Sequence, residues 1–556
     1  MPVQYSHRES CINIICCIHT LHAVFNSIYR RFGAGKIIGY MFLKFRLLIS
    51  LMLLPAALYA QVLLPKEGSK LNYRIIGFSL PAERGNKKPE AGYIIEIALG
   101  SHHIEDSFKK HLVKTINTKT TRVIGEVPLF GKQYTWRVSS KAQKTPGEFH
   151  YFSTLTIPDV DTAVTRFRII QQAEKYKDAY VILDATRAIY DMKGNAVWFL
   201  PDIDGISREY SVLKDLRATK YGTLTFIYED ATAYEVDYDG NILWRTPAKS
   251  HAGGDSTEHI HHEFVRLPGR HYMILGSEIA LWDKSLAAKN DRSSLYFPDD
   301  TIRPDINNQS LQRVPFGTII EYDKDGKVFW SWKTSKYFKT SDIYFHPGKR
   351  EEIDISPHEN SFYFDEKKKF IYLGFRDISR IIKIKYPEGK VVNVYGEIFK
   401  PNGGEMGNGL FCKQHSVKLS ANGLLYLYNN NVCNFSGFPK VVMLKEPIAP
   451  GGRLKKVWEY ECTIEGLKGK EQNTYQFTYG GNVVELPDQS IFTSMSTLYC
   501  KVFIVSKNKK ELWSGIPEKW STLFNKWDNV MQYKASFINN RKELERIIWH
   551  DEGINK

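Results

Sequence analysis

The chain has 556 residues, of which 43% are hydrophobic and 13% aromatic, and it carries a formal net charge of +15. This composition excludes a disordered chain and predicts a well-buried globular protein larger than a usual single domain. The lysines and arginines are scattered and form no block long enough for a nucleic-acid-binding arm, so no nucleic-acid partner is expected.

The first element along the chain is an export signal that begins late. Residues 41–60 read MFLKFRLLISLMLLPAALYA, in which two basic residues precede a long apolar run and then small residues. We therefore expect residues 1–40 to be a mis-assigned N-terminal extension and residues 41–60 to be a signal peptide. An uncleaved anchor is the alternative. No cysteine follows the cleavage region directly, which favours a soluble periplasmic protein, without stable membrane insertion after cleavage, over a lipoprotein.

The next segment, residues 61–158, is expected to form a small β-sandwich domain. It contains short alternating runs such as AGYIIEIAL, TRVIGEV and YTWRVSSK, separated by glycine, proline and polar clusters. The segment offers no cluster of chemically active residues. Its expected role is that of a platform or contact module.

Residues 159–556 contain an internal repeat in which a strand ends, the chain turns at glycine, and a second strand reaches a tryptophan. One copy, IIKIKYPEGKVVNV, has lost the tryptophan and ends at Val394. Six tight hairpins over this length predict a six-bladed β-propeller, because a single blade cannot bury both of its faces. The fold class expected for the whole chain is all-β. The other five copies end at Trp198, Trp244, Trp330, Trp458 and Trp513.

A strand-turn-strand element precedes most of these hairpins, and three copies open on histidine. If the first strands are the inner strands of successive blades, His262, His358 and His415 converge near the propeller axis. The fourth copy has Gly481-Asn482 at this place, so histidine is not a requirement of the framework. A packed or solvated role for each histidine is the alternative.

Two further features of this region allow two interpretations each. The segment HIHH at 259–262 could hold zinc, but alternation along a strand would place only two imidazoles on one face, so no metal is expected. The same alternation leaves open whether His261 or His262 faces the channel. The insertion between Leu281 and Gly317 could cover the channel mouth or be a surface loop.

The cysteines and one turn suggest a disulfide. Four cysteines follow residue 60, in a compartment that permits disulfides. Asn422-Gly423 predicts a two-residue hairpin turn, and the register counted from it sets Cys412 against Cys433 and His415 against Asn430. A Cys412–Cys433 bond would then clamp the hairpin that carries His415. A pairing of Cys462 with Cys500 is left open.

The motifs HHE at 261–263, HEN at 358–360 followed by Arg376, and QH at 414–415 resemble the bacterial PAPS-independent arylsulfotransferases, or aryl-sulfate sulfotransferases. The resemblance extends over nearly the whole chain after the leader. It implies small-molecule aryl sulfates and phenols as substrates and a sulfotransferase that works by a ping-pong mechanism without a cofactor. A homodimer is left open.

The resemblance also implies the roles of individual residues. His415 is the nucleophile that becomes a sulfohistidine, and His262, His358 and Arg376 bind and polarise the sulfuryl group. A neutral imidazole is a competent nucleophile, and a guanidinium fork suits two sulfate oxygens. A surface ion pair of Arg376 with Asp377 is the rival interpretation.

Two residues are weaker candidates for substrate binding. His261 competes with His262 for the place in the channel, and Asn360 could donate to a sulfate oxygen or simply cap its strand.

Two other classes of protein stay open. A non-catalytic exported β-propeller used as a binding module is the first alternative. The second is a quinone-dependent propeller dehydrogenase. Against this class, the chain has six repeats instead of eight. The adjacent cysteine pair of this chain, Cys16-Cys17, falls in the leader that we expect to be removed.

Overall fold

The computed structural model describes most of the chain from residue 63 onward. Residues 1–60, which we expect to be an extension and a signal peptide, lie outside the described residues. No helix in the described part is long and apolar enough to cross a membrane. The described residues are 63–80, 91–142, 146–203, 206, 208, 212–228, 232–247, 259–283, 295–296, 311–337, 357–396, 406–432, 438–464, 480–496 and 500–550.

The chain is all-β, and the described residues from Thr165 onward form a series of six small antiparallel sheets. Five of them contain four or more strands that follow one another along the sequence. The first sheet differs, because it joins three early strands to β34 (Ala535–Ile538), which comes from near the end of the chain. The early strands of that sheet are β9 (Tyr180–Leu183), β10 (Ala188–Asp191) and β11 (Ala196–Phe199).

The second, third and fourth sheets run in chain order. In the third sheet the ladder between β17 and β19 extends to Asp283 and Leu311, so part of the insertion after Leu281 is a long hairpin. Whether the rest of the insertion covers a channel lies outside the described residues. The strands are β12 (Leu213–Ala218), β13 (Leu224–Tyr228), β14 (Thr232–Val236), β15 (Ile242–Arg245), β16 (His259–Arg266), β17 (Tyr272–Asp283), β18 (Leu295–Tyr296), β19 (Leu311–Tyr322), β20 (Val328–Lys333), β21 (Glu359–Asp365), β22 (Phe370–Phe375), β23 (Arg380–Lys385) and β24 (Lys390–Tyr395).

The fifth and sixth sheets complete the series. The sixth sheet is wider than the others, because β8 (Thr165–Gln171) pairs with β32 from the N-terminal side of the chain. The strands are β25 (His415–Leu419), β26 (Leu425–Asn429), β27 (Lys440–Lys445), β28 (Lys455–Glu461), β29 (Asn482–Glu485), β30 (Ile491–Ser494), β31 (Val502–Val505), β32 (Glu511–Ser521) and β33 (Lys526–Asn529).

The sequence repeat corresponds to one edge of these sheets. All five tryptophans that end a repeat, and Val394 in the sixth copy, lie in the fourth strand of their own sheets. Trp198 and Trp513 are fully buried, and the indole of Trp244 stacks on Tyr272 with ring centroids 3.8 Å apart. These three tryptophans therefore contribute to the packing of the sheets.

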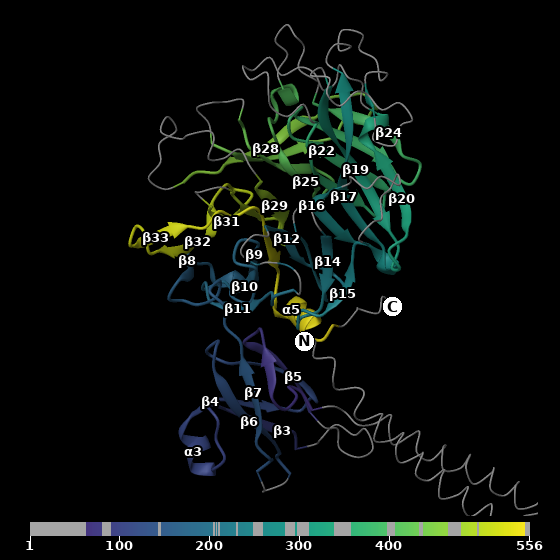
Figure 1. Cartoon of the computed structure of the whole chain (residues 1–556). Helices are drawn as coiled ribbons and strands as arrows, with labels where there is room; N and C mark the ends of the chain where they lie inside the picture. The colour runs from purple at the N-terminus through teal and green to yellow at the C-terminus, as the bar shows by residue number, and fades with distance from the viewer. Residues whose placement is uncertain are drawn as a thin grey trace, which may run out of the picture. The chain divides into compact units, whose positions relative to one another are not determined.

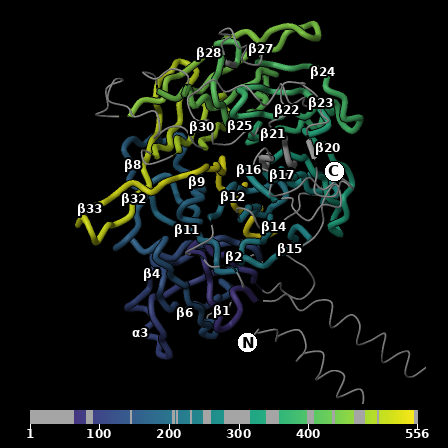
Figure 2. The backbone as a smooth tube through the Cα atoms, turned by 45° about the horizontal axis from the view of Figure 1, so that its top comes forward, coloured from purple at the N-terminus to yellow at the C-terminus, as the bar shows by residue number. Residues whose placement is uncertain are grey.

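The first strands of the six sheets form a closed circuit of neighbours. Strand β34 lies beside β12, and the circuit continues through β16, β21, β25 and β29 back to β34. Figure 1 labels β12, β16, β25 and β29 of this circuit, and Figure 2 also labels β21. Apolar side chains fill the space between successive sheets. Leu275 and Ile319 of the third sheet, for example, pack against Phe362 and Leu373 of the fourth. Because the first strands converge, residues far apart in sequence meet where these strands begin.

The segment before the six sheets forms two smaller sheets. One has five strands in the order β1-β7-β6-β3-β4, and the other pairs β2 with β5. The amide of Asn72 donates to the carbonyl of Phe199 in β11 at 2.7 Å, which ties this segment to the first of the six sheets. The strands are β1 (Ser69–Leu71), β2 (Ile75–Ser79), β3 (Tyr93–Leu99), β4 (Leu112–Thr118), β5 (Arg122–Glu126), β6 (Gln133–Ser140) and β7 (His150–Thr154).

Helices are few and short in the described residues. Near the C-terminus, the side chain of Asn540 caps one helix by accepting from the amide of Glu543 at 3.1 Å. The α-helices are α3 (Glu105–Lys110) and α5 (Arg541–Ile548), and the 3-10 helices are η1 (Glu174–Tyr176), η2 (Pro268–Arg270), η5 (Thr334–Lys336) and η6 (Met406–Gly409).

Candidate active site

The inner strands are bent at the points where their polar residues gather. A β-bulge interrupts β12, β16, β21 and β25 near their starts. Four residues at these places, Asp215, His262, His358 and Ser416, adopt the left-handed backbone conformation, with φ between 55° and 60°. Non-glycine residues are uncommon there, and a bulge re-aims the side chains around it.

The bulge in β16 overturns the expectation that His261 and His262 project to opposite faces. The left-handed turn at His262 brings the two rings together, with their Nδ1 atoms 2.8 Å apart. Strict alternation assumed a regular strand, and the strand is not regular here.

The bulges differ in where the left-handed residue lies. His262 is itself the left-handed residue of its bulge, whereas His415 precedes the left-handed Ser416. The alignment of the three repeated histidines stays a prediction.

The structure nonetheless brings the three histidines together. The ring centroid of His262 lies 5.4 Å from that of His358 and 5.9 Å from that of His415. Tyr533, which directly precedes β34, completes the group, with its ring 6.0 Å from His262 and 5.5 Å from His415. Four strands distant in sequence thus supply one cluster of imidazoles and a phenol.

His415 is held in a defined orientation. Its Nε2 atom lies 2.9 Å from the Tyr533 hydroxyl, and only 1% of the residue is exposed. Its Nδ1 atom is buried and has no hydrogen-bond partner among the described residues. Burial, reinforced by the positive charge of Lys534, holds the pKa of His415 well below its usual value. The ring is therefore neutral at neutral pH.

The neighbouring imidazoles are neutral for the same reason. Burial holds the pKa of His262 well below its usual value, and the nearby histidines lower it further. Burial lowers the pKa of His261 to about 3. A neutral ring keeps one N–H donor and one acceptor, so these histidines offer directed hydrogen bonds without a full charge.

Arg376 joins the cluster through a carboxylate. Its guanidinium pairs with Asp377, whose other oxygen lies 3.3 Å from Nδ1 of His358. The ammonium of Lys413 lies 3.6 Å from the same carboxylate. Burial raises the pKa of Asp377, but the hydrogen bond from His358 and the charge of Arg376 outweigh it, so the pKa is lowered. The Arg376–Asp377 pair named as a rival interpretation exists, although both side chains are largely buried.

Asn360 supports the cluster from behind. Its amide donates to the carbonyl of Gln414 at 2.8 Å, and Gln414 in turn donates to the carbonyls of Phe375 and Arg380. These bonds connect β21, β22 and β23 to Gln414, which directly precedes His415. Contact of Asn360 with a substrate stays a prediction.

The hairpin after His415 differs from the expected one. Leu419 pairs with Leu425, which leaves a wider turn than the two-residue turn expected at Asn422-Gly423, and the bulge sets His415 opposite Tyr428 instead of Asn430. The register argument for the disulfide is therefore wrong.

The described residues test only some of the expected disulfides. Cys433 lies outside the described residues, so its pairing with Cys412 stays a prediction. Cys462 and Cys500 are buried free thiols, so they do not form a disulfide with each other. The HIHH segment contributes to no group of three potential metal ligands within the described parts of the chain.

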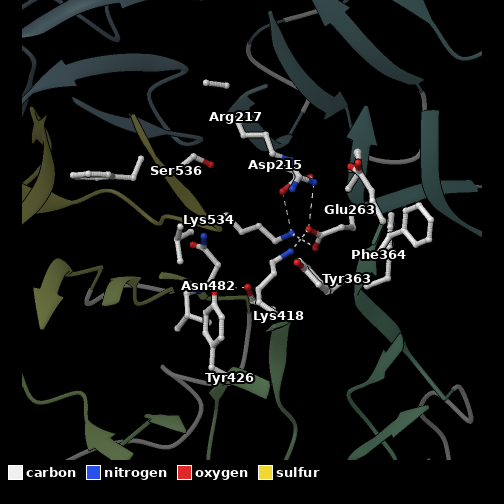
Figure 3. A pocket seen from close by; sticks show the side chains of 18 residues that line it. Asp215, Arg217, Glu263, Tyr363, Phe364, Lys418, Tyr426, Asn482, Lys534 and Ser536 are labelled. Atoms are coloured by element: carbon white, nitrogen blue, oxygen red, sulfur yellow. Dashed lines mark hydrogen bonds and ion pairs between the residues drawn. The ribbon is translucent and has the colours of Figure 1, made fainter. Parts of the chain in front are cut away.

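A layer of buried charges supports the histidines. The ammonium of Lys534 donates to the carbonyl of His262 at 2.7 Å and pairs with Asp215 and Glu263 (Figure 3). We call these charged side chains the ion layer. Its five members are Asp215, Arg217, Glu263, Lys418 and Lys534.

Sequence reasoning missed Tyr533, Lys534, Lys413 and the carboxylate that links Arg376 to His358. The segment MQYKASFI at 531–538 alternates like an inner strand but lacks the glycine turn and tryptophan of the repeat. The clue that could have identified this segment is its alternation, together with the tendency of propellers to close by pairing the end of the chain with the first sheet.

Comparison with known protein families supports the resemblance stated from the sequence. Residues 300–447 match the family model described as arylsulfotransferase (ASST). The matched segment contains His358, Asn360, Arg376 and His415 but neither His262 nor Tyr533. No curated protein sequence matches the chain.

Solved structures resemble the chain only distantly. A protein of unknown function from Bacteroides caccae is 13% identical and matches 67% of this chain and 99% of its own, with a TM-score of 0.36. The Cps50 (Swd1) β-propeller domain from Myceliophteria thermophila is 8% identical and matches 65% and 98%, with a TM-score of 0.29. A putative 6-phosphogluconolactonase from Bacteroides fragilis is 12% identical and matches 68% and 99%, with a TM-score of 0.30. Structural similarity at this level gives no information about function.

Proposed function

We propose that the chain is an aryl-sulfate sulfotransferase that moves a sulfuryl group from an aryl sulfate to a phenol through a sulfohistidine at His415. The observation that carries the proposal is the convergence of three histidines with the Arg376–Asp377 pair at the start of the inner strands. The family match over residues 300–447 supports the same reaction. The closed circuit of six inner strands supports a six-bladed propeller, with residues 61–158 as a β-sandwich before it.

In the first step, Nε2 of His415 attacks the sulfur atom and the bond between sulfur and the aryl oxygen breaks. This requires the ring proton on Nδ1, so that the Tyr533 hydroxyl donates to Nε2 in the resting state. The electron pair leaves with the phenolate, which takes a proton from the His358 imidazolium. Asp377 stabilises that imidazolium through Nδ1.

In the second step, the oxygen of another phenol attacks the sulfur and the N–S bond breaks. The electron pair returns to Nε2, and neutral His358 takes the proton of the incoming phenol. Both substrates thus react at one site in turn, which is a ping-pong mechanism.

The transition state carries charge on the peripheral sulfate oxygens and on the departing phenolate, by analogy with phosphoryl transfer. Arg376 and the N–H group of His262 are the donors we assign to those oxygens. Lys413 adds positive charge beside Arg376. His261 contacts His262 and is better suited to orient that ring than to reach a substrate.

The test is release of 4-nitrophenolate from 4-nitrophenyl sulfate by the purified protein, with a phenol acceptor and no nucleotide donor. We expect release that depends on the acceptor and a sulfated acceptor as product. Absence of acceptor-dependent release with several aryl sulfates would overturn the proposal and favour a binding module. A second experiment separates export from function. We propose that cleavage after residue 60 delivers the protein to the periplasm, and N-terminal sequencing of the exported form tests this.

A further inference from the structure

A separate cavity is lined in part by all five residues of the ion layer. Its volume is about 360 Å³, and its wall includes none of the histidines, Arg376 or Tyr533 (Figure 3). In two inner strands a lining residue comes shortly after a histidine of the site: Glu263 directly follows His262, and Lys418 lies three residues after His415. Sites for small ligands span about 300–1,000 Å³, so this volume suffices for a compact ligand.

The charged floor of the cavity carries surplus positive charge. Among the residues that the structure describes, Arg217, Lys418 and Lys534 form ion pairs with two carboxylates, those of Asp215 and Glu263. Burial raises the pKa of Glu263, but Lys418, Lys534 and Arg217 outweigh this and lower it, so the carboxylate stays ionised. The ion layer therefore holds three cations and two anions.

Two further carboxyl groups near the cavity do not remove the surplus. Asp184 accepts hydrogen bonds from the amides of Asp215 and Leu216, and burial raises its pKa to about 8, so it is mostly protonated at neutral pH. Glu366 lines the cavity, but both of its oxygens lie 2.9 Å from the ammonium of Lys220.

The surplus charge is accessible from the cavity. The side chain of Arg217 is 23% exposed and that of Lys418 is 16% exposed, whereas Lys534 is 4% exposed. The Nε atom of Arg217 has no hydrogen-bond partner among the described residues. Burial also lowers the pKa of Lys418, as expected for a buried cation whose charge is incompletely compensated.

Beyond this floor most of the lining residues are apolar or aromatic, and the polar residues Ser416, Asn482 and Ser536 complete the wall. It would bury the body of a ligand while the floor holds its charged end. The apolar and aromatic lining residues are Ala218, Val265, Phe362, Tyr363, Phe364, Tyr426, Val483, Val484 and Phe537.

We propose that this cavity is a second ligand site, distinct from the histidine site, which binds a small organic monoanion with an aromatic or branched apolar body. The anionic group contacts Lys418 and Arg217, and the body lies along the apolar wall. One negative charge neutralises the ion layer. The site does not depend on sulfuryl transfer, so it can exist whether or not the reaction proposed above occurs.

The test uses 1-naphthoate as the probe and the full chain without its leader, with binding measured by isothermal titration calorimetry. The protein carries His415→Ala and Arg376→Ala, so that the probe cannot bind at the histidine site. We expect one-to-one binding in this background, about tenfold weaker after an added Lys418→Met and about tenfold weaker for the uncharged analogue 1-naphthalenemethanol.

A second variant keeps the proposal testable if Lys418→Met fails to fold. Ala218→Phe fills the cavity from its wall, removes no charge, and should abolish binding. Lys455→Met, an exposed change in β28, is the matched control and should leave binding unchanged. Unaltered affinity in Ala218→Phe, or no binding in the His415→Ala and Arg376→Ala background, would overturn the proposal.

Discussion

Nε2 of His415 and the hydroxyl of Tyr533 lie 2.9 Å apart, although 118 residues separate them in the sequence. We expect Tyr533→Phe to lower kcat for 4-nitrophenolate release about tenfold, because it removes one hydrogen bond but keeps the ring. Steady-state kinetics with circular dichroism measure this. Unchanged kcat in a folded Tyr533→Phe protein would show that the hydroxyl has no part in the reaction.

His415→Asn should abolish turnover, with a loss on the order of 10⁴-fold or more, because it removes the nucleophile. The wild-type chain, mixed with 4-nitrophenyl sulfate without an acceptor and digested, should yield a peptide containing His415 that has gained one sulfuryl group. The matched control is His261→Asn, which changes a buried imidazole beside the site and should reduce turnover less. A sulfuryl group on another residue would contradict our assignment.

Arg376→Lys should lower kcat/KM about a hundredfold, because lysine keeps the charge but cannot present a planar pair of donors to two sulfate oxygens. Lys413→Met removes the ammonium that lies beside the same carboxylate, Asp377, but keeps the guanidinium of Arg376. This change should lower kcat/KM much less. Equal losses in the two variants would mean that Arg376 acts only through general charge.

The lowered pKa values of His415 and His262 affect the acid side of the pH profile. The reactive, neutral form of these two rings persists as the pH falls, so their protonation should cause no decline in kcat/KM near about 6.5, the usual histidine value. Stability should behave differently. As the pH falls below about 6.5, the unfolded chain binds protons that the folded chain does not, so the free energy of unfolding should drop. Urea titrations across this range measure the drop.

Glu263→Gln should destabilise the protein by about 3–5 kcal/mol, because it leaves three buried cations facing Asp215 alone. Lys418→Met removes a surplus cation from the same layer and should cost clearly less. Urea denaturation of the two variants provides the comparison. A larger loss for Lys418→Met would contradict the charge balance we assign to the ion layer.

The sequence was sufficient to locate the repeats and the three histidines. Each hairpin is local and marked by glycine and tryptophan, which is why Trp198 through Trp513 all lie in fourth strands. The bulges left no comparable signal, because His262 and Ser416 are ordinary strand residues whose left-handed conformation is imposed by packing. That is why the hairpin register was wrong at Leu419.

Tyr533 could not be found by repeat analysis, because its strand joins the first sheet only through long-range pairing with β9. The same holds for Lys534, whose partners Asp215 and Glu263 come from two other sheets. Local patterns carry no information about such partners.

The position of β34 also sets an order of events. Tyr533 and Lys534 follow all the histidines of the site in the sequence, so the histidines remain without these partners until β34 joins the first sheet and the circuit closes. Turnover would then begin only once the last strand has docked. The time at which activity appears during refolding would therefore report the docking of β34, separately from the formation of the sheets themselves.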